Sequence, residues 1–193
     1  EWCDAGVLRT LRQRSLARLR REVEPVEPAA LGRLLVAWHG LDRPRRGPAL
    51  REAIERLQGA AVPASDLETR LLPARVADYD PRDLDALLGA GEVVWYGAGA
   101  IGPRDGRVVL ALAEHAGLLV PEAAGPAGPV HDALRAQLRE RGALFFTQLA
   151  GRSGAFAPEV LAALWDLVWA GEVTNDSFAA VRAFLHPRAR RGR

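Results

Sequence analysis

Residues 84–96, LDALLGAGEVVWY, are echoed 80 positions later by residues 164–173, LWDLVWAGEV. In both copies leucines three residues apart, the spacing of one helix face, lead into Ala-Gly-Glu-Val. The glycine, Gly91 or Gly171, is suited to end a helix in the left-handed conformation, and the valine two residues later begins an extended run. The repeated stretch therefore predicts a helix that stops at glycine and passes directly into a strand.

The first copy completes a longer pattern. Helical apolar spacing is present at residues 50–57 and 67–72 before the helix that starts at Asp80-Pro81, and Val62 marks a short strand. Strands at residues 93–96 and 108–112 flank a glycine-rich loop, residues 97–106. This order describes a winged helix, a helix-turn-helix followed by a β-hairpin. Ser65 and Glu68 have the spacing of a capping box for the second helix.

The second copy repeats the plan with a smaller wing. Helices are expected at residues 130–142, from residue 146, and from Pro158, with Leu144–Phe146 in the position of the Val62 strand. The stretch from Phe178 to Leu185 has helical spacing where a returning strand would stand. The predicted fold class is mainly α with small β wings (α+β), as tandem winged-helix (helix-turn-helix) domains.

The expected domains follow from the breaks in these patterns. Residues 1–48 form a helical tail of an upstream domain plus a connector, and residues 188–193 form a basic tail. The winged-helix domains span residues 49–120 and 129–187. Leucines at one face of the helix at residues 6–24 should pack on the helix that ends at Trp38 or on the next domain; they are Leu8, Leu11, Leu16 and Leu19. With no methionine in its 193 residues, the chain is expected to be an internal piece of a longer polypeptide.

Composition limits the classes of function. The chain has 26 basic residues, all arginine, against 24 acidic ones, so its net charge of +2 does not by itself indicate a nucleic-acid partner. A GC-rich genome is one cause of such arginine usage, and attraction of phosphate by the arginine-rich ends is another. No run of 18 apolar residues predicts a membrane span, and a lone cysteine excludes an internal disulfide and fits a cytoplasmic protein.

The sequence predicts no catalytic residue, metal or cofactor within the chain. Its four histidines are scattered without ligand spacing. The glycine pattern Gly97-x-Gly99-x-x-Gly102 leads into a second strand, whereas a dinucleotide fingerprint must open a helix, so it is interpreted as a wing tip. Because the chain has no lysine, it has no phosphate-binding P-loop.

Four stretches of the chain resemble the large helicase-related (Lhr-type) superfamily 2 helicases of bacteria, especially those of actinobacteria. They are residues 16–26 (LARLRREVEPV), 72–76 (LPARV), 90–95 (AGEVVW) and 164–176 (LWDLVWAGEVTND). The resemblance implies a position in the C-terminal half of such a helicase, where tandem winged helices precede a β-barrel in an arrangement similar to that of winged-helix DNA glycosylases. It places ATP and Mg²⁺ only in helicase lobes outside this chain.

The resulting expectation is a non-catalytic DNA-binding fragment of an ATP-dependent helicase involved in DNA repair. Its partners would be single-stranded or duplex DNA, bound mostly without sequence preference, and the rest of the helicase. The residues expected to contact phosphate lie in turns, at helix starts or in the wing; they are Arg75, Arg82, Arg104, Arg107 and Arg152.

Four points stay open at this stage. The winged helices could instead be a scaffold for assembly or homo-oligomerisation, with Trp165 and Trp169 at the interface, or the fragment could itself excise bases. Of Trp95 and Tyr96, on opposite faces of a strand, one is expected in the core and the other against a base or a neighbouring domain. The arginines of the N-terminal helix belong either to a solvated connector or to the DNA path.

Overall fold

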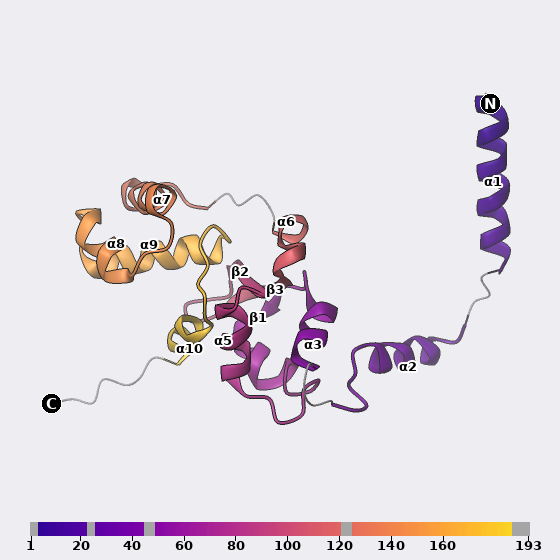
Figure 1. Cartoon of the computed structure of the whole chain (residues 1–193), viewed down its shortest axis with the longest axis horizontal. Coiled ribbons are helices and arrows are strands. Elements are labelled where there is room, and N and C mark those ends of the chain that lie inside the picture. Colours follow the sequence, from indigo (N-terminus) through magenta and orange to yellow (C-terminus); the bar gives the residue numbers. More distant parts are fainter. Residues whose placement is uncertain (1–3, 23–25, 45–48, 121–124, 187–193) are drawn as a thin grey trace. The chain divides into compact units, whose positions relative to one another are not determined.

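The computed structural model describes residues 4–22, 26–44, 49–120 and 125–186, and they fall into two compact units that divide after Trp38 (Figure 1). The first unit holds α1 (Ala5–Glu22) and α2 (Pro28–Trp38). Leu8, Leu11, Leu16 and Leu19 of α1 are all exposed. No packing of these leucines on α2 is therefore observed within the first unit, and their packing on the next domain stays a prediction. The predicted basic tail, residues 188–193, lies outside the described residues.

The second unit contains the predicted winged helix. Its elements are α3 (Ala49–Leu57), β1 (Val62–Pro63), α4 (Ala64–Asp66) with a π-helical continuation (Leu67–Leu71), α5 (Pro81–Gly89), β2 (Val93–Ala100) and β3 (Gly106–Leu112). The antiparallel sheet has the order β1-β3-β2, with Trp95 opposite Leu110 and Val62 opposite Val108. The fold class predicted from the sequence is confirmed.

Local chemistry sets the ends of α5, the third helix of the winged helix. The Asp80 side chain accepts a hydrogen bond from the Arg82 N–H at 2.8 Å, and Pro81 supplies a first helical residue with a suitable fixed φ. Gly91 has a φ of +71°, a conformation that glycine adopts at little steric cost, and the chain then enters β2. The predicted passage from helix through glycine to strand is present.

Two local expectations are wrong. The Ser65 hydroxyl donates to Asp105 at 2.6 Å rather than capping a helix with Glu68, because the helix already begins at Ala64. Leu144–Phe146 form no strand: Phe145 has extended backbone at the start of α8, and its N–H is bonded to the Gln148 side chain. A strand at this position would need a returning partner strand, and the described part of the second copy contains none.

After the sheet, a 3₁₀ turn (Ala113–His115) and α6 (Ala116–Leu119) lead towards the second copy, which is entirely helical where described. It comprises α7 (Pro129–Arg141), α8 (Phe146–Ser153), α9 (Ala157–Trp169) and α10 (Ala179–Leu185). A small core joins the first three of these helices through Leu134, Leu149, Val160 and Leu167. In place of a wing, the chain continues into α10, as its spacing predicted.

The segment after α9 completes the core of the first winged helix. Phe178 is fully buried, and its ring meets the Trp95 ring edge to face at a centroid distance of 5.6 Å. The Thr174 hydroxyl donates to the Trp95 carbonyl, and Val181 lies in the same core. Residues 39–193 therefore form one compact unit, although the sequence pattern divides them at residues 120–129.

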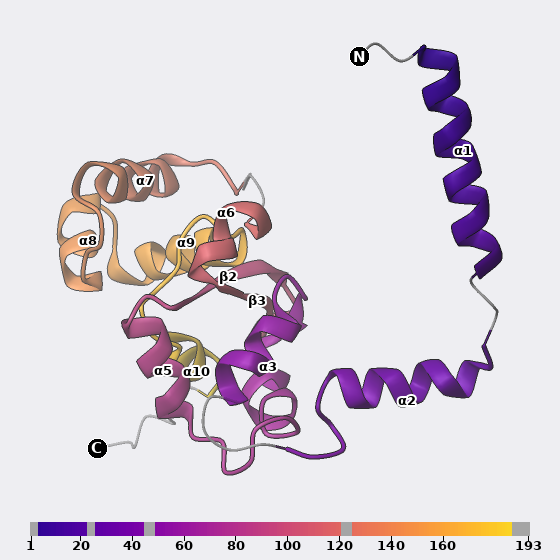
Figure 2. The ribbon, with the colours of Figure 1, turned by 45° about the vertical axis from the view of Figure 1, so that its right-hand side comes forward.

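Close backbone packing brings α9 onto the hairpin (Figure 2). A side chain at Gly97 in β2 would collide with the Val168 carbonyl and the Trp169 backbone, and one at Gly106 in β3 would enter the Trp169 ring. Glycine is needed at both positions because helix and sheet touch there without space for a β-carbon. Gly97 and Gly106 thus serve packing at the base of the wing, and only residues 101–105 form the loop.

An arginine of α10, Arg182, forms ion pairs between the C-terminal segment and the first winged helix. Arg182 lies 2.6 Å from Glu68 and 2.7 Å from Asp85, and Asp85 also accepts a hydrogen bond from the Phe178 N–H at 2.7 Å. Burial alone would raise the pKa of Asp85, but the hydrogen bonds from Arg182 and Phe178 lower it overall. All four groups are half-buried or buried, so removing one partner would leave a shielded polar or charged group unpaired, and the contacts hold the docked segment in place in this sense.

The lowered pKa of Asp85 predicts a specific loss of stability in acid. Its ordinary value is 3.8, so the unfolded chain takes up a proton at a higher pH than the folded one. The contribution of Asp85 is therefore complete above about pH 4 to 5 and is lost as the pH falls through the folded-state pKa. We expect Asp85→Asn to lower the free energy of unfolding at pH 7 by about 1–2 kcal/mol. Urea unfolding at pH 6 and pH 3 should then show a smaller acid loss in Asp85→Asn than in the unchanged chain; an equal loss would contradict this role.

Candidate nucleic-acid interface

The third helix of a helix-turn-helix is the usual element that enters a DNA groove. In this chain neither third helix, α5 or α9, has an exposed face with a net positive charge. The exposed residues of α5 are Pro81, Arg82, Asp83, Ala86 and Gly89, and those of α9 are Ala157, Pro158, Glu159, Leu161, Ala162 and Asp166. Thus α9 exposes two carboxylates and no arginine. Acidic side chains repel the phosphates of a duplex, so neither helix face favours DNA.

Arg82, one of the predicted phosphate contacts, is already paired. Its guanidinium lies 2.6 Å from Asp80, with two further hydrogen bonds from Nε to the same carboxylate. These hydrogen bonds lower the pKa of Asp80 to about 2, so Asp80 is ionised at neutral pH. The pair leaves little positive charge at the start of α5.

The wing carries two arginines without such partners. Arg104 lies in the loop and Arg107 in β3; both are exposed, and neither has an ion pair with any residue that the structure describes. Between them, Asp105 accepts hydrogen bonds from the Ser65 hydroxyl and from the Gly106 N–H, the latter at 2.8 Å. The Ile101 N–H closes the loop by donating to the Asp105 carbonyl at 2.7 Å. Asp105 thus fixes the loop to the α4 end of the domain and leaves the arginine charges outward.

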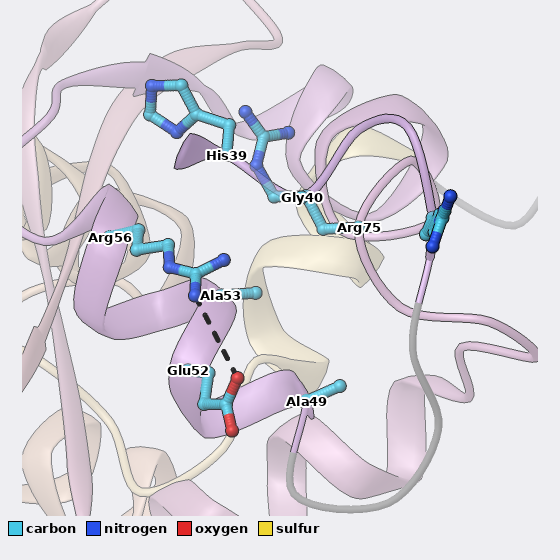
Figure 3. Close-up of a pocket in the computed structure, with 8 residues that line it drawn as sticks. His39, Gly40, Ala49, Glu52, Ala53, Arg56 and Arg75 are labelled. Carbon is cyan, nitrogen blue, oxygen red and sulfur yellow. Dashed lines mark ion pairs between the residues drawn. The ribbon is translucent and has the colours of Figure 1, made fainter. Parts of the chain in front are cut away.

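A second positive feature is a basic cleft, shown in Figure 3, which we define by eight lining residues. They are His39, Gly40, Arg43, Ala49, Glu52, Ala53, Arg56 and Arg75. Arg56 makes a loose ion pair with Glu52, at 4.0 Å across one turn of α3. The cavity has a volume of about 20 Å³, enough for one water-sized group and too small for a typical small-molecule substrate.

Arg75 is the predicted phosphate contact that lines this basic cleft. Its Nη1 donates to the Leu71 carbonyl at 2.8 Å, while its Nε is shielded from solvent without a hydrogen-bond partner. The Nδ1 atom of His39 is shielded and unpartnered in the same way. Burial lowers the pKa of Arg75 below its ordinary value. The basic cleft therefore offers unused hydrogen-bonding groups to an incoming ligand.

The remaining predicted residues lie in the second copy. Arg152 is exposed on α8 and has no ion pair in the described structure, far in sequence from the wing. Trp165 and Trp169 of α9 stack with ring centroids 5.4 Å apart, and the Trp165 ring lies 4.4 Å from that of Phe184 in α10. In this chain the two tryptophans make an internal contact between α9, α10 and the hairpin.

The aromatic pair in β2 is also used internally. Trp95 is buried in the first core, and Tyr96 is buried on the other face of the strand, where its hydroxyl donates to the Leu119 carbonyl at 2.6 Å. Neither ring is available to a base. The Tyr96 hydroxyl is bonded within its own predicted domain, and the buried ring shows that the expected base stacking is wrong.

Sequence reasoning missed three members of the basic cleft, His39, Arg43 and Arg56. The prolines and glycines of residues 40–48 are typical of the connector expected at the end of residues 1–48, and that composition hides the contact of residues 39–43 with α3. It also missed two phenylalanines, Phe145 and Phe156, that are each 79% exposed. Among the described residues, no three histidine, cysteine, aspartate or glutamate side chains lie close enough to hold a metal ion.

No helix of the described chain combines the length and the apolar character needed to cross a membrane. Among the described residues between His39 and Ala113, Arg43 and Arg75 of the basic cleft and Arg104 and Arg107 of the wing have no ion pair, and Arg56 has only the loose pair with Glu52.

Comparison with known proteins gives a consistent result. Residues 26–113 match a family model described as the winged-helix domain of large helicase-related protein, and this range includes the wing and the basic cleft. The whole chain is 44% identical over 197 residues to an "Lhr helicase/ probable uracil glycosylase" of Mycolicibacterium smegmatis. It is 34% identical over 229 residues to an "Lhr helicase/uracil glycosylase" of Escherichia coli. The chain spans only 13% and 15% of the lengths of these two relatives.

Proposed function

The chain belongs to the large helicase-related (Lhr-type) helicases, and on that basis we propose that it is a non-catalytic DNA-binding segment of such a helicase. The observation that carries the proposal is the pair of exposed, unpaired arginines, Arg104 and Arg107, on a wing whose loop is fixed by Asp105. Cations held in place by the fold can neutralise backbone phosphates without ordering a flexible loop first.

Binding through the wing rather than through the third helices makes sequence-independent contact the expected mode. Phosphate contacts position a protein on nucleic acid and carry no direct sequence information, whereas base edges are read in the grooves. The acidic exposed face of α9 and the Asp80–Arg82 pair at α5 support this mode. A segment that contacts only phosphate lets an enzyme move along DNA.

The proposal leaves base excision outside this segment. The names of both relatives include uracil glycosylase, and a glycosylase needs a carboxylate or similar group that is free to act on an extruded base. Here the two inner carboxylates with shifted pKa values, Asp85 and Glu172, are bound by Arg182 and Arg135. For Glu172, the hydrogen bond from Arg135 is the main cause of a lowered pKa. A carboxylate held ionised in this way is a poor general acid.

The chain lacks lysine and therefore a P-loop, so we propose no ATP or Mg²⁺ site within it. We propose that ATP and Mg²⁺ act in helicase lobes elsewhere in the protein. The further partners of the segment are the rest of the helicase, with a β-barrel beyond this segment. The protein works in DNA repair in the cytoplasm. Homo-oligomers remain part of the proposal. The alternative of a pure assembly scaffold is not favoured, since Trp165 and Trp169 are occupied within the chain.

The test is DNA binding by the wing variant Arg104→Gln/Arg107→Gln. Each lost phosphate contact should reduce the slope of log K against log salt by about 0.7–0.9, and the pair should weaken binding roughly 10-fold or more near 0.1 M salt. Fluorescence anisotropy with labelled duplex and single-stranded oligonucleotides measures both quantities.

The control is Arg82→Gln, which removes an exposed arginine that is already paired with Asp80. This variant should change the slope of log K against log salt by less than half of the change expected for one phosphate contact. Absence of binding by the unchanged chain at tens of micromolar, or equal losses in the two variants, would contradict the proposal.

A further inference from the structure

The basic cleft concentrates positive charge from three separate segments of the second unit. Arg43 comes from the stretch before α3, Arg56 from α3 itself, and Arg75 from the turn after the π-helical segment. Only one carboxylate, that of Glu52, lines the cleft with them. Three guanidinium groups against one carboxylate leave an excess of positive charge. Their convergence suits an anion better than a neutral or cationic ligand.

The unpartnered atoms indicate where an anion would bind. Arg75 is held by its bond to the Leu71 carbonyl, so its guanidinium is already positioned while Nε donates to nothing. His39 adds a second shielded nitrogen that lacks a partner, the Nδ1 atom of its ring. A buried donor that stays unpaired destabilises a fold, and an oxygen acceptor removes that loss. The chain has therefore kept two polar groups in a form that a ligand oxygen would satisfy.

The size of the cavity limits the ligand to one that inserts a single oxygen from outside. A volume of about 20 Å³ holds one water-sized group, so a nucleobase, a nucleotide or a metabolite does not fit inside. A phosphate of a nucleic-acid backbone meets this limit, because one non-bridging oxygen can enter while the rest of the strand stays in solvent. Arginine forks match phosphate oxygens with two parallel hydrogen bonds.

We propose that the basic cleft binds one backbone phosphate of a nucleic acid, with Arg75 and His39 contacting the inserted oxygen and Arg43 and Arg56 the outer oxygens. This site rests on the proposed function and adds to it a contact that shares no residue with the wing. The stretch at residues 39–43 lies close to α3 at this site: Gly40 has a φ of +65°, and a β-carbon there would lie 3.3 Å from Arg56 Nη1.

The test compares Arg43→Gln/Arg56→Gln with Arg51→Gln by fluorescence anisotropy over 50–300 mM salt. Arg51 is the matched control because it lies on the same helix, α3, and pairs instead with Glu114 at 3.2 Å. We expect the double variant to lose about one phosphate from the salt slope and to bind roughly 5- to 10-fold more weakly, while Arg51→Gln binds as the unchanged chain does. Arg75→Gln should show the same loss, and its melting temperature reports whether it folds.

The outcomes separate this site from the proposed function. If the unchanged chain binds DNA and the double variant keeps the full salt slope, the phosphate site is overturned and the wing proposal stands. If the unchanged chain binds no DNA, both are overturned. A second arm follows the His39 ring signals by NMR: DNA should shift them, and inorganic phosphate at matched ionic strength should do so only at millimolar concentration. If micromolar inorganic phosphate saturates the shift, the ligand of the cleft is free phosphate, and the proposal of a nucleic-acid phosphate is overturned.

Discussion

Phe178→Ala is expected to lower the free energy of unfolding by about 3–5 kcal/mol, the range for truncating a buried phenylalanine. The side chain is 0% exposed, meets the Trp95 ring edge to face and is followed by α10, whose Arg182 is bound to Glu68 and Asp85. Removing the ring leaves a cavity in the core of the first winged helix, although the residue comes 66 positions after the end of β3. Urea unfolding followed by tryptophan fluorescence measures the change.

Phe156→Ala is the matched control for this prediction. The same atoms are removed, but Phe156 is 79% exposed, so the free energy of unfolding should change by less than about 0.5 kcal/mol. If Phe178→Ala were as mild as Phe156→Ala, the C-terminal segment would not complete the first core, and residues 39–193 would be two modules.

Gly97→Ala should lower the free energy of unfolding by a similar amount, because it overpacks the core rather than leaving a cavity. One added methyl group would collide with the Val168 carbonyl and the Trp169 backbone, and backbone atoms in a packed helix cannot rotate away as a side chain can. Relief requires α9 to move off the sheet, so a loss of about 3 kcal/mol or more is expected, at the upper end for overpacking. On this size of chain that corresponds to a melting temperature lower by roughly 6–12 °C.

Gly151→Ala controls for the glycine change itself. Gly151 lies in α8 with no atom within 4 Å of an added β-carbon, so alanine should be neutral or stabilise the chain by up to about 1 kcal/mol. Differential scanning calorimetry of both variants gives the comparison. A melting temperature of Gly97→Ala within 2 °C of the unchanged chain would mean that α9 does not rest on β2 as described.

Features governed by local chemistry were predictable from the sequence. The helix at residues 81–89, the glycine stop and the two wing strands follow from apolar spacing, the Asp-Pro start and the left-handed preference of glycine, and all are present. The replacement of the second wing by a helix was also visible in the spacing of residues 178–185. These elements depend on residues close in the chain.

Features that depend on distant partners were not predictable. Ser65 could be matched with Glu68 on spacing alone, yet the partner it uses, Asp105, is 40 residues away. Gly97 and Gly106 looked like loop residues, and only the approach of Trp169 explains them. One local contact was not predictable either: Arg82 and Arg104 are equivalent as arginines in a sequence, and only the side-chain geometry pairs Arg82 with Asp80 and separates their expected roles. The phosphate contacts themselves stay predictions.

The most direct measurement of the central account is NMR mapping of the DNA contact on the isotope-labelled chain. Addition of a short duplex should shift amide signals of the wing, residues 101–107, and of residues 39–43 at the basic cleft. Signals on the exposed faces of α5 and α9 should move little, because those faces are paired or acidic. Shifts concentrated on α5 or α9, with the wing unaffected, would contradict the account.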